Sequence, residues 1–543
     1  MFQHNKIKLK LWQMNVIVSL LMVSLYNIPF WKELYKIVHP SHFLDYAFML
    51  SVFLLISLLI NFLLNLSTGK YTYKLIYSVI FLGASSALYF MNQYNILIDS
   101  DMVQNIFETN SAEAFDFVNM TLFIYVVFLG FLPLFIILKV KLKFDSLTRS
   151  LLQRLLMIVI GLGIIGLLLF ISYPNYASIA RNQRHLSHKI VPTNFIFASI
   201  SYVKQSLRSS RKALKIITQD ARIDKSWKDK KSVLILILGE TARADHFSLN
   251  GYKPMTTPFM NARVATGEII NYPNVSSCGT STAVSLPCIF SNLVRENYSK
   301  SEAKTTENLL DFMLKTEYSV EWRDNNTGCK GLCDRADFRD LTDVQGNEFC
   351  QGDECYDEVL LDKLSQQIQN NPKSQVIVLH QKGSHGPAYY LRYPQQFKKF
   401  TPTCDSNELQ SCSQKQVINA YDNTLLYTDY FIDQSIKMLE QLPESTQTAL
   451  IYMSDHGESL GENNIYLHGT PYFMAPTAQT HVPLIVWLSK QTQLYFGIDY
   501  KCLKINAQQK LSHDNYFHSV LGLLHIQTQY YKKGFDIFSE CRN

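Results

Sequence analysis

The sequence predicts a membrane domain of five transmembrane helices, followed by an α/β sandwich domain built around a mainly parallel sheet. Two observations lead to this fold class. Long apolar stretches fill the first 175 residues, and from Ser232 onward the apolar residues form short continuous runs instead. The chain has 543 residues, of which 47% are hydrophobic, so it has room for both parts.

The membrane domain, residues 1–175, contains five apolar stretches. Each is close to the roughly 20 residues that a helix needs to cross a bilayer core. None has the polar face that helices of a soluble domain keep. The first is long for a cleaved signal peptide and four more follow it, so we interpret it as a retained anchor. The stretches are residues 11–31, 43–66, 75–91, 117–138 and 155–173.

Loop charge predicts the orientation, because short cytoplasmic loops are enriched in Lys and Arg. The loop between Asn92 and Asp116 has no Lys or Arg and carries several acidic residues, so it is expected outside. The N-terminus is expected in the cytoplasm, and everything after Tyr173 on the outer face. The basic residues of the inner segments are Lys6, Lys8, Lys10, Lys70, Lys74, Lys139, Lys141, Lys143, Arg149 and Arg154.

The linker, residues 176–230, has one periodic part. Apolar residues recur there at helical spacing, with basic residues on the other faces. A basic amphipathic helix on anionic lipid head groups and a packed bridging helix explain this pattern equally well. The apolar positions are Ile196, Ile200, Val203, Leu207 and Leu214, and the basic ones are Lys204, Arg208, Arg211, Lys212 and Lys215.

The third part, residues 231–543, has apolar runs at 233–238, 376–379, 449–453 and 482–488. Continuous runs of this kind are typical of strands buried on both faces of a parallel sheet, with helices such as 413–440 covering them. Ligands of such sheets gather at the carboxyl ends of the strands. Functional residues are therefore expected directly after each run.

Glu240 follows the first run, and Asp455 and His456 follow the third. Two strand ends would therefore bring two carboxylates and an imidazole to one edge of the sheet, and these groups are good zinc ligands. A single carboxylate at a strand end is more often a helix cap or a surface charge. The combination predicts a metal site.

A nucleophile is expected between Cys278 and Cys288. Glycine and hydroxyl residues lead there into an apolar helix start, where backbone N–H groups stabilise a phosphate. A threonine hydroxyl can be activated by a metal. Plain helix capping is the alternative, and composition does not separate Thr280, Ser281 and Thr282.

All ten cysteines lie beyond residue 277, in the part expected on the outer face of the membrane. An even set restricted to an exported portion is typical of disulfides in an oxidising compartment. A zinc ribbon ligated by Cys329, Cys333, Cys350 and Cys355 is the alternative. Pairing by proximity would join Cys278–Cys288, Cys329–Cys333, Cys350–Cys355, Cys404–Cys412 and Cys502–Cys541.

Two further histidines, His481 and His513, are candidates for a second metal. Hydrogen-bonded histidines in the scaffold are more common, and we prefer that interpretation.

Five motifs together resemble those of the lipid A phosphoethanolamine transferases, a family that includes the mobile colistin-resistance enzymes. They occur in the family's order, and the likeness covers nearly the whole chain. The resemblance implies an alkaline phosphatase/sulfatase-like catalytic domain. The motifs are Gly239-Glu240-Thr241-Ala242-Arg243, the segment from Cys278 to Cys288, Gly383-Ser384-His385-Gly386-Pro387, Ser454-Asp455-His456-Gly457-Glu458-Ser459 and Leu467-His468-Gly469-Thr470-Pro471.

The resemblance implies roles for individual residues. Glu240, Asp455 and His456 match the family's zinc ligands. Thr282 matches the threonine that binds zinc and becomes modified with phosphoethanolamine. Residues matching those around the donor phosphate and head group are Lys330, His385 and His468, together with Thr327, where relatives often have serine.

Asn105, Thr109 and Glu113 match head-group residues in the second outer loop. They are spaced i, i+4, i+8, so they would line one side of a helix if residues 102–115 are helical. Glu113 would then oppose the ethanolammonium of the donor lipid. A solvated helix face is the alternative.

The resemblance thus implies an inner-membrane enzyme with a periplasmic catalytic domain, one catalytic Zn²⁺ and room for a second. It would transfer phosphoethanolamine from phosphatidylethanolamine to lipid A through Thr282. The transfer would lower the negative charge of the cell surface and give polymyxin and colistin resistance. We expect a monomer that binds no nucleic acid. The alternatives are a transferase with another acceptor or donor, a phosphatase or sulfatase that releases its product to water, and a membrane receptor.

Overall fold

The computed structural model describes residues 9–109, 111–210, 213–224, 227, 230–351 and 354–542. The chain folds into two compact units. The helical unit comprises Met1–Val103 and Val118–Tyr202, and the sheet unit comprises Gln104–Phe117 and Val203–Asn543. A short segment of the N-terminal part of the chain, Gln104–Phe117, therefore belongs to the sheet unit.

The helical unit has four described segments long and apolar enough to cross a membrane, namely Phe43–Ser67, Tyr73–Gln93, Met120–Lys139 and Thr148–Ile171. A bent pair of helices makes a fifth if it counts as one span. Each predicted apolar stretch coincides with one of these segments. The helices are α1 (Leu11–Leu25), α2 (Ile28–Val38), α3 (Phe43–Ser67), α4 (Tyr73–Gln93), α7 (Met120–Tyr125), the π-helix η1 (Val126–Phe131), α8 (Leu132–Lys139) and α9 (Leu147–Ile171).

The bend between α1 and α2 is 61° and has a local cause. Pro29 lies in the first turn of α2, where its missing N–H is tolerated, but it cannot continue a helix from α1. The Asn27 amide donates to the carbonyls of Met22 at 2.8 Å and Val191 at 2.9 Å. The break in the first predicted stretch is thus stabilised by hydrogen bonds.

The chain continues through α10 (Tyr173–Asn182) and the 3₁₀ helix η2 (Arg184–Lys189) into α11 (Thr193–Ser210). The predicted linker helix was too long, because α11 ends at Ser210 and Leu214 lies beyond it. Ile200, Val203 and Leu207 of its apolar positions are exposed. Lys6 and Lys8 of the predicted inner segment, and Arg211 and Lys212 of the linker, lie outside the described residues.

The sheet unit is built on an eight-stranded sheet with strand order β15-β5-β14-β11-β4-β10-β6-β7. All of its ladders are parallel except those that β14 makes with β11 and β5. The sheet is therefore mainly parallel, with one reversed strand. The strands are β4 (Ser232–Gly239), β5 (Ile269–Ser276), β6 (Ser319–Asp324), β7 (Asp337–Asp340), β10 (Gln375–His380), β11 (Gln447–Ser454), β14 (His481–Leu488) and β15 (Leu511–Ser512).

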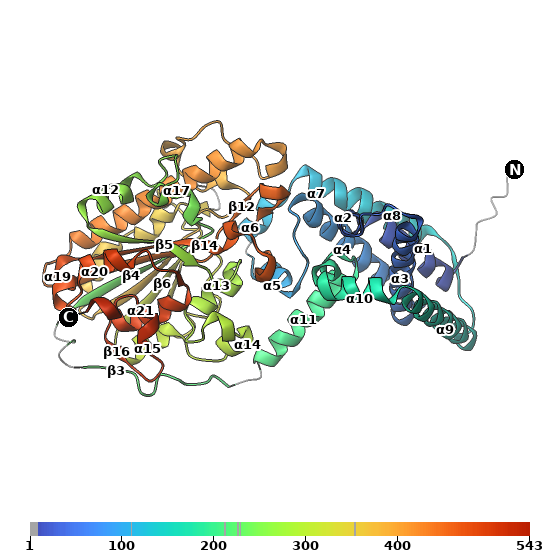
Figure 1. The fold of residues 1–543 in the computed structure, drawn as a ribbon, viewed down its shortest axis with the longest axis horizontal. Coiled ribbons are helices and arrows are strands. Elements are labelled where there is room, and N and C mark those ends of the chain that lie inside the picture. The colour runs from blue at the N-terminus through green and yellow to red at the C-terminus, as the bar shows by residue number, and fades with distance from the viewer. Residues whose placement is uncertain are drawn as a thin grey trace. The chain divides into compact units, whose positions relative to one another are not determined.

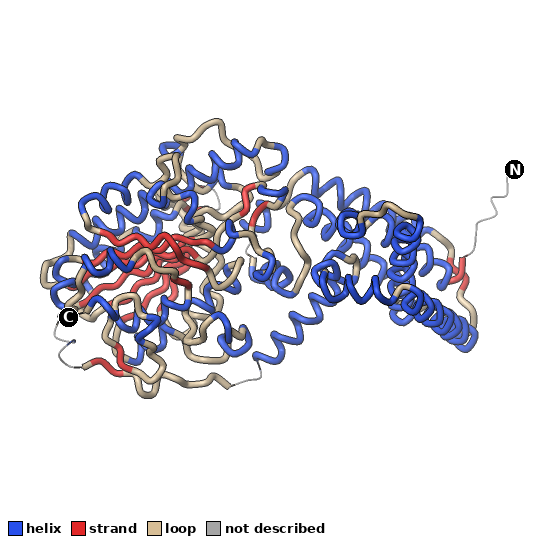
Figure 2. Tube along the Cα trace, in the orientation of Figure 1, coloured by secondary structure: helices blue, strands red, loops and turns tan. Residues whose placement is uncertain are grey.

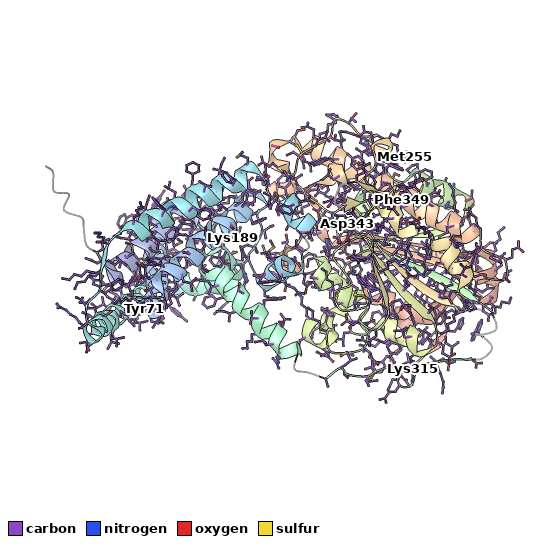
Figure 3. The ribbon with its side chains drawn as sticks, turned by 180° about the vertical axis from the view of Figure 1, so that it is seen from behind. Tyr71, Lys189, Met255, Lys315, Asp343 and Phe349 are labelled. Atoms are coloured by element: carbon purple, nitrogen blue, oxygen red, sulfur yellow. A yellow bond between two sulfur atoms is a disulfide. The ribbon has the colours of Figure 1, made fainter. Side chains whose placement is uncertain are left out.

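The four predicted apolar runs lie in β4, β10, β11 and β14, where nearly every residue is buried. Helices cover both faces of this sheet, as Figure 1 shows, and Figure 2 shows the strands side by side between the helical layers. On one side lie α12 (Pro258–Thr266) and α17 (Gln414–Glu440), and on the other α15 (Leu309–Lys315) and α21 (Asp514–Leu523). Met255 precedes α12 and Lys315 ends α15, and these two residues lie on opposite sides of the sheet (Figure 3).

The apolar core on the α15 and α21 side contains Leu234, Leu236 and Leu238 of β4 packed with Phe312 and Phe517. Burial of such side chains contributes about 1.5–3 kcal/mol each. This core holds β4 in place, so the polar residues that follow its carboxyl end have a fixed position. The remaining helices include α5 (Ser100–Glu108), α6 (Ser111–Asp116), α13 (Thr282–Ile289), α14 (Lys300–Ala303), α16 (Leu364–Asn370), α18 (Thr477–Thr480), α19 (Lys490–Tyr495) and α20 (Tyr500–Asn506).

The sheet unit contains five disulfides, and no described cysteine is free. They join the cysteines that are neighbours in the sequence. The pairs are Cys278–Cys288, Cys329–Cys333, Cys350–Cys355, Cys404–Cys412 and Cys502–Cys541. This pairing leaves no thiolates for the alternative zinc ribbon.

Candidate active site

The polar residues after β4 and β11 lie side by side because these strands are parallel neighbours. Gly239 pairs with Ser454 at the ends of the two strands. Glu240, Asp455 and His456 follow directly, and each is at most 1% exposed. The sheet register thus places two carboxylates and an imidazole at one buried point.

Thr282 is the first residue of α13 and faces this point. Its hydroxyl donates to the two carboxylate oxygens of Glu240, at 3.2 and 3.0 Å. The Nε2 atom of His456 is 3.4 Å from the same hydroxyl. Thr280 is turned elsewhere, because its hydroxyl donates to the Thr470 carbonyl at 2.7 Å. Of the three hydroxyl residues considered above, Thr282 is the one that contacts the acidic cluster.

The donor atoms of Glu240, Asp455 and His456 fit a metal ion. One ligand atom from each lies within 4.8 Å of the others. His456 Nε2 is 3.3 Å from Glu240 Oε1 and 3.2 Å from Asp455 Oδ2. Its Nδ1 atom can donate to the Gly457 carbonyl at 2.9 Å, which leaves the Nε2 lone pair directed at the cluster.

The pKa shifts of these three residues also support a metal site. Burial, together with the charge of Asp455, raises the pKa of Glu240 well above its usual value, and burial also raises the pKa of Asp455. Burial lowers the pKa of His456, so this imidazole stays neutral. Asp455 Oδ2 is buried without a hydrogen-bond partner in the described part of the chain. Adjacent buried carboxylates are costly unless a cation compensates them.

Two residues that we did not predict hold Glu240 in place. The Asn326 amide donates to Glu240 Oε2 and to the Gln381 carbonyl, both at 2.8 Å. Gly383 lies so close that a Cβ there would be 2.9 Å from the Glu240 carbonyl oxygen, and its φ is +53°. The glycine is visible in a motif quoted above, but Asn326 follows a strand that the sequence did not predict.

Glu458 is a further residue that the sequence pattern did not single out. Its carboxylate contacts His468 Nδ1 at 2.8 Å and accepts a hydrogen bond from the Tyr389 hydroxyl at 2.7 Å. The rings of His468 and His456 are 4.4 Å apart. His456, Glu458 and His468 form a second group whose ligand atoms are close enough for a metal.

A cavity of 40 Å³ opens next to Thr282 and brings the predicted substrate-binding residues together. Most of its lining residues are polar or charged. Its lining contains Asn105, Glu108, Thr109, Glu113, Ser281, Thr282, Ala283, Thr327, Lys330, His385 and His468.

Residues 102–115 do not form one continuous helix, which is the condition under which Asn105, Thr109 and Glu113 would line one side of it. The segment forms two short helices, α5 and α6, and Thr109 lies outside both. Its hydroxyl donates to the Asn105 carbonyl at 2.6 Å, a side-chain bond that competes with continuation of the helix. Asn105, Thr109 and Glu113 nevertheless all line the cavity.

The Glu113 carboxylate is already in contact with a neighbouring imidazole. Its Oε1 is 2.9 Å from His385 Nε2. Burial alone would raise the pKa of Glu113, but the neighbouring His385 outweighs burial and lowers this pKa to about 2. The carboxylate is therefore ionised at neutral pH.

Lys330 also lines the cavity and lies in a turn closed by the Cys329–Cys333 disulfide. Its ammonium donates to the carbonyl and the hydroxyl of Thr327, at 2.9 and 2.8 Å. Its φ is +53°, a left-handed conformation that costs energy in a residue with a side chain. The fold thus holds one cation at a fixed position beside Thr282.

His481 and His513 are hydrogen-bonded scaffold residues, as we preferred. His513 Nδ1 accepts from the Cys278 amide at 3.0 Å, and Nε2 is 3.0 Å from the Ser454 carbonyl. Burial lowers the pKa of His513 to about 3, so it stays neutral. His481 Nε2 is 2.6 Å from the Pro273 carbonyl. His513 has both ring nitrogens engaged and links the Cys278 segment to the end of β11.

Two family models match the chain. The model described as Sulfatase matches residues 232–526, and the model described as Phosphoethanolamine transferase EptA/EptB matches residues 56–207. Phosphoethanolamine transferase EptA of Escherichia coli (strain K12) is 43% identical over 467 residues, which are 85% of this chain and 84% of that protein. Phosphatidylethanolamine transferase Mcr-1 of Escherichia coli is 39% identical over 431 residues, covering 76% and 78% of the two chains.

A solved structure is similar over nearly the whole length. It is the integral membrane protein lipooligosaccharide phosphoethanolamine transferase A (EptA) from Neisseria meningitidis. The two structures superpose with a TM-score of 0.94 at 36% sequence identity, covering 99% of this chain and 100% of that one. The similarity therefore includes both the apolar helices and the sheet unit.

Proposed function

Since the chain belongs to the phosphoethanolamine transferase family, we propose that it transfers phosphoethanolamine from phosphatidylethanolamine to a phosphate of lipid A, with Thr282 as the covalent carrier. The observation that carries this proposal is the contact of the Thr282 hydroxyl with Glu240, at 3.0 Å, beside a cavity that also contains Lys330. A nucleophile, an acceptor for its hydrogen and a fixed cation are thus placed together.

In the first transfer, Thr282 Oγ1 attacks the phosphorus of phosphatidylethanolamine. Its hydroxyl hydrogen points to Glu240, which accepts it. The phosphorus–oxygen bond to diacylglycerol breaks, and this alcohol leaves with a proton. Lys330 stabilises the charge on the phosphate, and His468, engaged by Glu458 through Nδ1, can deliver the proton from Nε2.

In the second transfer, a phosphate oxygen of lipid A attacks the phosphorus now attached to Thr282. The bond between phosphorus and Thr282 breaks, the threonine oxygen regains the proton held by Glu240, and the hydrogen of the acceptor phosphate passes to His468. Two steps suit two lipid substrates that do not fit one small site together. The start of α13 presents backbone N–H groups, which favour a phosphate on its first residue.

The metal in this proposal is zinc, held by Glu240, Asp455, His456 and Thr282. When bound, it supplies a Lewis acid that makes the threonine hydroxyl more acidic and offsets the two buried carboxylates. The support is the chemistry of the donor set and the unpaired Asp455 Oδ2. The second group, around Glu458 and His468, provides room for another ion.

We propose that Glu113, with Asn105 and Thr109, receives the ethanolammonium of the donor. Glu113 is ionised and lines the same cavity as Thr282. In this arrangement Glu113 also binds His385, so the head group has to share the carboxylate with an imidazole. Thr327 acts by holding Lys330, because its hydroxyl accepts a hydrogen bond from the Lys330 ammonium.

For the whole chain we propose five spans in the bacterial inner membrane, a cytoplasmic N-terminus and a monomeric enzyme. Residues 1–175 would form the membrane domain, 176–230 the linker and 231–543 the periplasmic catalytic domain. The exposed apolar positions of α11 support a helix that lies on the lipid surface. Each transfer adds a cationic amine to lipid A, which weakens the binding of polymyxins such as colistin.

The proposal is tested with Thr282→Ala in full-length protein expressed in Gram-negative cells. We expect mass spectrometry of lipid A to show no added phosphoethanolamine, because the carrier oxygen is missing. Thr280→Ala is the matched control and should keep most of the activity, since its hydroxyl bonds to the Thr470 carbonyl. Modification of lipid A by Thr282→Ala at a rate near wild type would rule out the covalent mechanism.

A further inference from the structure

A second cavity adjoins the one beside Thr282. Its volume is 540 Å³, and Glu108, Thr327 and Lys330 line both cavities. Lys304, Thr306 and Arg335 line only the larger one, which we call the Lys304–Arg335 groove. All of these residues belong to the sheet unit. The same lysine therefore lines both cavities.

We propose that the Lys304–Arg335 groove binds the phosphorylated sugar of the acceptor lipid while phosphoethanolamine is attached to Thr282. This inference rests on the transferase function proposed above. Size gives the first argument. The groove's volume of 540 Å³ lies within the roughly 300–1,000 Å³ of ordinary small-molecule sites, so a phosphorylated sugar has room there.

Arg335 gives the second argument, because its guanidinium is held in one orientation. Its Nε and Nη2 atoms bind the two carboxylate oxygens of Asp311. Asp311 is 6% exposed and also caps α15 by accepting from the backbone N–H of Asn308 at 2.7 Å. Arg335 itself is one-third exposed, and within the described part of the chain its Nη1 atom makes no hydrogen bond. A pre-oriented guanidinium of this kind suits a phosphate.

Lys304 and Thr306 add a cation and a hydroxyl. Lys304 is one-third exposed, with its ammonium 3.4 Å from Glu108 Oε1. Lys330 lies 3.9 Å from the other Glu108 oxygen, so one carboxylate lies between a cation of the groove and the cation beside Thr282. The Thr306 hydroxyl is buried, and no described residue gives it a hydrogen-bond partner. An acceptor phosphate would find both lysines, the guanidinium and this hydroxyl around it.

The arrangement separates the two lipids. The donor head group is placed on the Glu113 and His385 side of Thr282, and the acceptor enters from the Lys304 and Arg335 side. In the transfer, an acceptor phosphate oxygen forms the new bond to phosphorus, and the bond between phosphorus and Thr282 breaks. Lys330, on the wall common to both cavities, can contact the two phosphates in turn.

The test separates loading of Thr282 from its discharge. Full-length Lys304→Gln and Arg335→Gln variants are mixed in detergent with phosphatidylethanolamine, and diacylglycerol release and phosphoethanolamine on Thr282 are followed. Discharge is then measured with lipid A and, in a separate arm, with water alone. Lys490→Gln is the matched control, because Lys490 follows β14 at the sheet edge where β11 begins, away from Thr282.

We expect both groove variants to load at the wild-type rate and to discharge to water unchanged. The KM for lipid A should rise about tenfold, as the loss of one charged phosphate contact predicts. An unchanged KM would overturn the inference, and so would slower loading, which would assign the groove to the donor. Lys304 is exposed, so its variant tests the proposal even if Arg335→Gln misfolds. A wild-type enzyme that never carries phosphoethanolamine on Thr282 would instead overturn the proposed function, and the groove assignment with it.

Discussion

The Glu240 carboxylate depends on side chains from two other parts of the chain. Thr282 donates to it from the start of α13, and Asn326 donates to it from the loop after β6. The Asn326 amide is itself fixed, because it also donates to the Gln381 carbonyl. A residue that orients a metal ligand in this way usually matters for metal affinity nearly as much as the ligand itself.

We therefore predict that Asn326→Ala lowers zinc affinity about 10- to 100-fold, since Glu240 loses its fixed donor. Competition with a chromogenic chelator measures this change, and chelation should abolish lipid A modification until zinc is restored. Asn325→Ala is the matched control. Its amide donates to the Cys355 carbonyl and to Asp357, so it should affect stability while zinc affinity stays near wild type. Equal zinc affinity in the two variants would contradict the assignment.

The residues of the site were predictable to different degrees. Glu240, Asp455 and His456 follow long apolar runs, so their positions at the sheet edge could be inferred from the pattern. Asn326 could not, because β6 carries Glu321, Arg323 and Asp324 and has no apolar run. These charges are buried through partners that are distant in sequence, such as His380, which lies 2.6 Å from Asp324. Only the folded chain shows that such a strand is internal.

At the scale of elements, the α5–α6 segment is attached to the rest of the sheet unit by ion pairs. Glu113 contacts His385 at 2.9 Å, and Asp116 binds the buried guanidinium of Arg392. Arg392 also donates to the His385 carbonyl at 2.9 Å. One arginine therefore ties α6 to the loop that carries His385, and both walls of the small cavity are positioned together.

This attachment should weaken in acid. The pKa of Glu113 is about 2 in the folded protein, against an ordinary value of 4.5. A lowered carboxyl pKa contributes stability that is present above 4.5 and is lost as the pH falls toward 2, here on the order of 3 kcal/mol. Hydrogen exchange of α5 and α6, corrected for intrinsic rates, should be constant from pH 7 to about 5 and accelerate below 4.5.

Glu113→Gln should remove most of this pH dependence, because glutamine does not titrate. Glu444→Gln provides the control, since Glu444 is exposed and lines a different cavity. Acceleration that persists unchanged in Glu113→Gln would mean that another group holds the segment. The i, i+4, i+8 spacing did not show that α5 and α6 are separate helices, because the contacts of Glu113 with His385 and of Asp116 with Arg392 are made with residues distant in sequence.

At the scale of the whole molecule, the disulfides lie in the sheet unit alone and close loops of very different length. Cys502–Cys541 joins residues 39 positions apart, whereas Cys329–Cys333 joins residues 4 apart. Chain entropy predicts that the long loop contributes about 4 kcal/mol and the short one about 2 kcal/mol. The short one, however, encloses Lys330.

Replacing each pair with alanines should therefore give opposite rankings. Replacement of Cys502 and Cys541 should lower the thermal unfolding temperature more. Replacement of Cys329 and Cys333 should lower lipid A modification more. Thermal unfolding and lipid A mass spectrometry on the same preparations measure both effects. If the two double variants rank alike in both assays, the short disulfide has no separate role in holding Lys330.

The division of the chain was the least predictable feature. Gln104–Phe117 lies between apolar spans in the sequence, yet it packs with the sheet unit and supplies Asn105, Glu108, Thr109 and Glu113 to the cavity beside Thr282. Loop charge predicted only that this segment faces outward. It also bonds to residues far along the chain, such as Lys300, which lies 196 positions from Gln104, and hydropathy contains no information about such contacts.

This division has a practical consequence for inhibitor discovery. A fragment that begins near Val203 keeps the proposed metal ligands and Thr282, but it lacks four of the residues that line the cavity. Compounds screened against such a fragment would meet an open, shallow surface, and their most favourable poses could overlap the volume that α5 and α6 occupy in the intact enzyme. Screening against full-length protein, or against a fragment to which residues 104–117 have been grafted, would select molecules that fit the enclosed site.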